Sequence, residues 1–150
     1  MSRALLPLLL LLPLPASACA SDAAMRTVAT EDAPEAIGPY SQALAAGGFL
    51  FTSGQIALRP DGSFAGGGIE EETRQVLANL AAVLEAAGCG REDVVKCTVF
   101  LTDLEDFGAV NELYGAWFGG HRPARSTVQV AQLPRGARIE IEMVARLPGS

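Results

Sequence analysis

The sequence predicts an α+β domain in which two helices cover one face of a mixed β-sheet. Short runs of alternating or continuously apolar residues, which are typical of strands, lie near both ends of the chain and once in its middle. Two longer segments with apolar residues at helical spacing lie on either side of the middle strand. At 150 residues, the chain is long enough for one domain with a sizeable core.

The first part of the domain is predicted to consist of three short strands and a stiff loop. The loop, residues 33–42, contains two prolines and Gly38, which exclude regular structure, so it presents Tyr40 on a rigid backbone. Gly54 follows the third strand, where it would let a ligand approach the bare backbone, although glycine is equally common at a strand bulge. The three strands are residues 26–30, 43–46 and 49–53.

The middle of the domain is predicted to be a helix, a strand and a second helix. The first helix, residues 69–87, has one apolar face and three glutamates at its positively polarised N-terminus. Residues 94–102 form a strand with apolar residues on both faces, which places it inside the sheet. Asp103 caps the second helix, which ends at Gly119. Asn111 lies at the rim of this helix's apolar face, where it can reach either a site or solvent.

The last two strands carry the candidate active site. Residues 127–130 and 139–143 alternate in the β manner, and the turn residues at 133–136 predict that the two strands are adjacent and antiparallel. If they pair, Arg125 and Glu140 face the same cleft. Arginine would offer a rigid, two-pronged cation for a small carboxylate, and glutamate a base for water.

Composition argues against a nucleic-acid partner and a metal site. The chain has 17 acidic residues against 11 basic ones, and no stretch concentrates lysine or arginine. No cysteine or histidine spacing suggests a metal ligand set. Cys97 alternates with apolar residues as a small buried side chain does, and with Cys89 it does not make a disulfide framework.

The N-terminal segment is predicted to be a secretory leader. Residues 1–20 contain one arginine, a leucine-rich run and then small residues, which fits cleavage before Ser21. The alternative is processing before Cys19, which would leave a lipid-bearing cysteine and anchor the protein to a membrane. In either case the sequence predicts an exported protein, periplasmic or secreted, whose domain spans residues 26–147.

Two helices on one face leave the other face of the sheet uncovered. A lone domain of this size would have to hide that face, and several copies packed around an axis would do so. The sequence therefore predicts self-association.

Several short motifs occur in a fixed order from residue 33 onwards. Taken together they are specific, although each one is weak alone, and on them the chain resembles the YjgF/Rid family of reactive intermediate deaminases over residues 26–147. The motifs are Ala33-Pro34, residues 36–42, residues 53–56, Asn79-Leu80, Val95-Lys96, Phe107, Val110-Asn111, residues 123–126, Leu133-Pro134 and residues 139–142.

The resemblance implies a chorismate-mutase-like fold, a homotrimer with clefts between subunits, and cofactor-free hydrolysis. The implied substrates are enamines and imines such as 2-aminoacrylate, which yield 2-oxo acids and ammonia. On that pattern Arg125 binds the substrate carboxylate and Glu140 positions and activates water. Tyr40, Gly54 and Asn111 line the cleft.

Two departures from the family bear on substrate range. Thr127 stands where many members have cysteine, and residues 118–125 form a shorter segment than in the best-known members. The alternative function is a non-catalytic protein of the same fold that binds small carboxylates. A ribonuclease role, attributed to some relatives, is disfavoured by the acidic composition.

Overall fold

A computed structural model of the chain describes residues 24–149. The predicted leader, residues 1–20, and the candidate lipidation site Cys19 lie outside the described residues. Within the described part, no helix is both long enough and apolar enough to cross a membrane.

Within residues 24–149, six strands form one mixed sheet with the order β1-β2-β3-β6-β4-β5. Only β4 and β5 pair in parallel; the other neighbours are antiparallel. The predicted central strand, now β4, lies inside the sheet as expected. The strands are β1 (Arg26–Val28), β2 (Ala43–Ala46), β3 (Phe49–Thr52), β4 (Val94–Leu101), β5 (Ala124–Gln129) and β6 (Ile139–Arg146).

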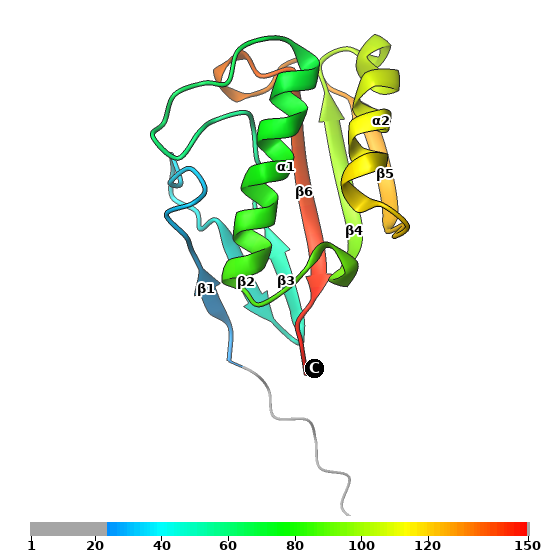
Figure 1. Cartoon of the computed structure of the whole chain (residues 1–150). Coiled ribbons are helices and arrows are strands. Elements are labelled where there is room, and N and C mark those ends of the chain that lie inside the picture. The colour runs from blue at the N-terminus through cyan, green and yellow to red at the C-terminus, as the bar shows by residue number, and fades with distance from the viewer. Residues whose placement is uncertain (1–23, 150) are drawn as a thin grey trace, which may run out of the picture.

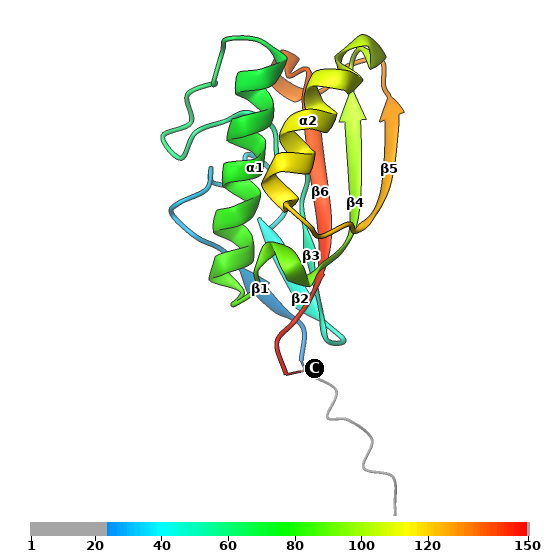
Figure 2. The ribbon, with the colours of Figure 1, turned by 45° about the vertical axis from the view of Figure 1, so that its right-hand side comes forward.

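Two helices, α1 (Ile69–Ala86) and α2 (Phe107–Phe118), pack on the same face of this sheet (Figure 1, Figure 2). The predicted α+β class is therefore confirmed. The core fills the space between the helices and the sheet and excludes water from its largest side chains. Its fully buried members include Leu50, Val76, Leu80, Val83, Leu84, Val94, Cys97, Val99, Leu101, Ile139, Ile141 and Met143.

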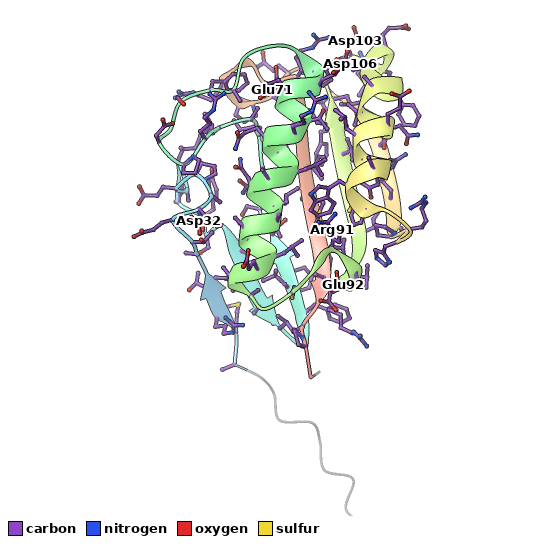
Figure 3. All side chains as sticks on the ribbon, in the orientation of Figure 1. Asp32, Glu71, Arg91, Glu92, Asp103 and Asp106 are labelled. Carbon is purple, nitrogen blue, oxygen red and sulfur yellow. The ribbon has the colours of Figure 1, made fainter. Side chains whose placement is uncertain are left out.

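The start of α2 differs from the prediction by one short turn. Asp103 accepts a hydrogen bond from the backbone of Glu105, so it does cap a helical segment, but that segment is a 3-10 turn, and α2 itself begins at Phe107. Asp103 and Asp106 lie together at this end of the molecule (Figure 3). The Asp106 carboxylate forms an ion pair with Arg138 at 2.8 Å, which ties the turn to the entry of β6.

The prediction that the last two strands are adjacent and antiparallel is wrong. β5 lies at the outer edge of the sheet beside β4, whereas β6 lies between β3 and β4. The physical reason is the helix between β4 and β5: a chain that crosses the sheet through a helix returns in its original direction, so the two strands pair in parallel. Residues 130–138 then carry the chain to the other side of β4, and the turn at 134–136 lies in that connection.

The sheet face opposite the helices carries several exposed apolar side chains in the single chain. Its side chains include Leu44, Phe51 and Val128, which are 38%, 47% and 43% exposed. Leu44 and Phe51 lie on strands whose alternate residues are buried beneath the helices, and Val128 lies on the edge strand β5 as the register partner of Phe100. Leu44, Phe49 and Phe51 are adjacent exposed apolar side chains on this face, and a patch of this kind is typical of a protein interface.

Candidate active site

A cavity of about 310 Å³ lies next to Glu140. The loop that carries Tyr40 forms one wall, the segment after β3 forms another, and Pro134 and Glu140 close it. Three of the predicted site residues, Tyr40, Gly54 and Glu140, therefore come together here. Apolar side chains and backbone line most of the remaining surface, as is usual for a small-molecule site.

Gly54 has a direct steric relation to Glu140. Gln55 and Ile141 exchange backbone hydrogen bonds of 2.9 and 3.1 Å, which hold the segment after β3 against β6. A Cβ atom on Gly54 would lie 1.9 Å from Oε1 of Glu140. The glycine is needed here because the catalytic candidate itself, rather than a ligand, occupies the space of the missing side chain.

The pKa of the Glu140 carboxyl group is raised above that of an ordinary glutamate. Its side chain is half-buried, and burial raises its pKa, with a further increase from the nearby negative charge of Glu142. A carboxylate with a raised pKa in a cavity is a candidate for general acid–base chemistry.

The loop that carries Tyr40 is held by Gln42, a residue that the sequence analysis did not single out. The buried Gln42 amide donates hydrogen bonds to the backbone carbonyls of Thr30 and Pro34, at 3.0 and 2.8 Å, and accepts one from the Thr30 backbone at 2.7 Å. These bonds close the loop at both ends. The sequence signal for Gln42 was a polar residue directly before the apolar run of β2, but the sequence alone does not show that this residue is buried.

Arg125 and Asn111 form a second group of predicted residues, at the edge of the sheet. Arg125 donates a hydrogen bond from Nη2 to Oδ1 of Asn111 at 2.9 Å. Its guanidinium lies over the rings of Tyr114 and Phe107, with 4.6 and 5.6 Å between Cζ and the ring centroids. A cavity of about 420 Å³ between α2 and the start of β5 opens beside it.

These two groups lie on opposite faces of the sheet. Arg125 is the register partner of Cys97, which is buried beneath the helices. Glu140 is the partner of Phe100 and therefore points away from the helices. The prediction that Arg125 and Glu140 face the same cleft rested on the pairing of their strands, and β5 and β6 do not pair, so within one chain the two side chains are not brought together.

Each group is an incomplete site. Among the described residues, no carboxylate lines the cavity beside Arg125, and no lysine or arginine lines the cavity beside Glu140 to bind a substrate carboxylate. Within residues 24–149, no cluster of three or more histidine, cysteine or acidic side chains is arranged to hold a metal ion.

Comparison with known proteins gives close matches over most of the chain. Residues 30–147 match the family described as Endoribonuclease L-PSP. The chain is 54% identical to a RutC family protein of Synechocystis over 83% of this chain and 98% of the relative. It is 50% identical to a 2-iminobutanoate/2-iminopropanoate deaminase of Mus musculus over 80% of this chain and 90% of the relative. A crystal structure of a Rid family protein from Yersinia pestis superposes with a TM-score of 0.81 at 47% identity, covering 83% and 100% of the two chains.

These relatives correct the predicted location. They include deaminases of mouse and human, and a 48% identical reactive intermediate deaminase of Arabidopsis that is named chloroplastic. Against these relatives, the prediction of an exported protein, periplasmic or secreted, is wrong. A leucine-rich run followed by small residues is a compositional signal, and by itself it does not identify a compartment.

Proposed function

Because the chain belongs to the Endoribonuclease L-PSP family, which includes the Rid deaminases, we propose that it hydrolyses 2-imino acids at a site shared by two copies of the chain. The substrates are 2-iminobutanoate, 2-iminopropanoate and their enamine tautomers such as 2-aminoacrylate. The products are the corresponding 2-oxo acids and ammonia. Relatives named for this reaction, at about 50% identity, support imine deamination as the activity.

The division of the site residues into two incomplete groups carries the proposal. One group supplies a cation at the edge strand β5, and the other supplies a carboxylate beside a small cavity. The exposed apolar side chains on the outer face of the sheet support association with further copies, and a closed ring of three would bury them. In such an assembly Arg125 of one protomer completes the Glu140 cavity of its neighbour.

The chemistry follows from the residue types. Arg125 binds the substrate carboxylate through its planar fork and so fixes the plane of the adjacent C=N bond. Glu140 accepts a proton from water as the water oxygen bonds to the imine carbon. The substrate reacts as its protonated iminium form, so this step gives a carbinolamine, and Glu140 returns the proton to the carbinolamine nitrogen. The C–N bond then breaks as the hydroxyl proton passes to the Glu140 carboxylate, which forms the C=O group of the 2-oxo acid and releases ammonia. An iminium carbon is already electrophilic, so positioning and proton transfer are the contributions required of the protein.

The direct test is hydrolysis of 2-iminobutanoate generated in place, followed as 2-oxobutanoate or ammonia. Wild-type protein is expected to accelerate hydrolysis, and Arg125→Ala and Glu140→Ala are each expected to lower kcat/KM by at least about 100-fold. Native mass spectrometry checks that both variants keep the wild-type assembly. Equal rates in all three proteins, no faster than buffer, would contradict the proposal. Saturable binding of 2-oxobutanoate without turnover would instead indicate a small-carboxylate-binding protein.

Replacing Glu142 by glutamine is expected to extend activity to lower pH. Glu142 is the second cause of the raised pKa of Glu140, after burial, so removing its charge lowers that pKa. The base form of Glu140 is lost as pH falls through its pKa, and a lower pKa therefore moves the acid limb of the kcat/KM profile to lower pH. The measurement is the pH profile of both proteins, and an unchanged acid limb would contradict either the influence of Glu142 on the pKa of Glu140 or the role of Glu140 as the titrating base.

A further inference from the structure

Arg125 is held in place by neutral groups alone. Among residues 24–149 no carboxylate forms an ion pair with it; its contacts are two aromatic rings and one amide oxygen. Arg138 provides the contrast, because its guanidinium is neutralised by Asp106 at 2.8 Å and serves to join two segments of the fold. The positive charge of Arg125 thus stays available to an anion, while the side chain is already ordered.

The three groups that hold Arg125 come from one stripe of α2. Phe107, Asn111 and Tyr114 are spaced i, i+4 and i+7, so they lie on the same side of the helix. The two ring faces attract the delocalised cation, and the amide oxygen of Asn111 accepts one of its five N–H groups. Enough donors remain for a two-pronged contact with a carboxylate.

We propose that Phe107, Asn111 and Tyr114 are positioning residues that fix the plane of the Arg125 guanidinium before the substrate arrives, with Tyr114 contributing most. The inference rests on the proposed function, since it concerns the carboxylate-binding half of that site. Asn111 thereby acts through Arg125 rather than as a general lining residue of the cleft. Ordering the long arginine side chain in advance removes a loss of rotamer freedom from the binding step.

Tyr114 makes the closest ring contact and is the most buried member of the stripe. It is 7% exposed, against 41% for Phe107, and its ring packs on that of Phe118 with 4.7 Å between centroids. The Tyr114 hydroxyl is buried beside the Cys97 thiol and makes no hydrogen bond of normal geometry. The ring face, rather than the hydroxyl, is therefore the part that acts on Arg125.

The test measures binding of 2-oxobutanoate and of its uncharged amide, 2-oxobutanamide, by calorimetry on the full-length protein. Tyr114→Phe keeps the ring and is expected to bind both ligands as wild type does. Tyr114→Leu removes the ring face and is expected to bind the carboxylate about tenfold more weakly, while its affinity for the amide is unchanged. In turnover, the same variant raises KM and leaves kcat within about twofold of wild type. A merely structural role would weaken both ligands together.

Two exposed positions keep the test decisive if Tyr114→Leu does not fold. Asn111→Ala and Phe107→Leu are each expected to weaken carboxylate binding about threefold. Asn111→Asp keeps the shape and the hydrogen bond but neutralises Arg125, so it is expected to bind the carboxylate more weakly than Asn111→Ala does. Wild-type carboxylate affinity in these three variants, with affinity lost in Arg125→Ala, would overturn the inference.

The same measurements separate this inference from the proposed reaction. A wild-type protein that binds 2-oxobutanoate without turnover would refute the reaction, yet the expected ranking of the variants would still support the positioning role. Turnover that depends on Arg125 but not on Phe107, Asn111 and Tyr114 would support the proposed reaction and refute the positioning role.

Discussion

Mixing Arg125→Ala with Glu140→Ala is expected to restore deaminase activity that neither variant has alone. The two side chains lie on opposite faces of the sheet of one chain, so a working site requires one from each of two protomers. In a randomly mixed 1:1 trimer population, about a quarter of the sites combine an intact arginine with an intact glutamate. The measurement is the rate of 2-oxobutanoate formation after the two variants are unfolded and refolded together, with native mass spectrometry to count mixed assemblies.

A second mixture serves as the matched control. Glu140→Ala and Gly54→Ala both damage the same half of the site, so no combination of their protomers contains an intact carboxylate group in its correct place. That mixture is expected to stay inactive. If the first mixture also stays inactive although mixed assemblies form, the proposal of a site shared by two protomers is wrong. At least one of Arg125 and Glu140 then does not have the role proposed for it.

The elements of this fold were predictable from local sequence patterns, but the order of the strands was not. The spacing of apolar residues along α1 and the apolar residues on both faces of β4 give nearly the observed boundaries. The pairing of β5 with β4, and of β6 with β3 and β4, depends on how α2 returns the chain to the sheet. No pattern within either strand carries that information.

The same limit applies to the site. Family resemblance identified the residues, yet which face of the sheet each one occupies depends on register, and a change of one residue in register reverses the face. Arg125 is opposite Cys97, and Glu140 is opposite Phe100. Gln42 was missed for a related reason, since a polar residue reveals its burial only when the loop that it ties down is known.

Gly54→Ala is expected to lower kcat by roughly 100-fold or more, an effect close to that of removing the general base itself. The added Cβ would lie 1.9 Å from Oε1 and 2.7 Å from Cδ of Glu140, so the carboxylate has to leave its position. The backbone at Gly54 is not in the left-handed region, so alanine meets no conformational penalty there. The measurement is kcat with saturating 2-iminobutanoate.

Two comparisons show whether displacement of Glu140 causes that loss. Gly66→Ala places a Cβ in open space at a glycine that also lies outside the left-handed region, so it is expected to retain wild-type kcat. In thermal unfolding, Gly54→Ala should be less destabilising in a Glu140→Ala background, because the clashing side chain is absent. Equal destabilisation in both backgrounds would mean that the glycine serves another contact, and the steric account of this half of the site would then be wrong.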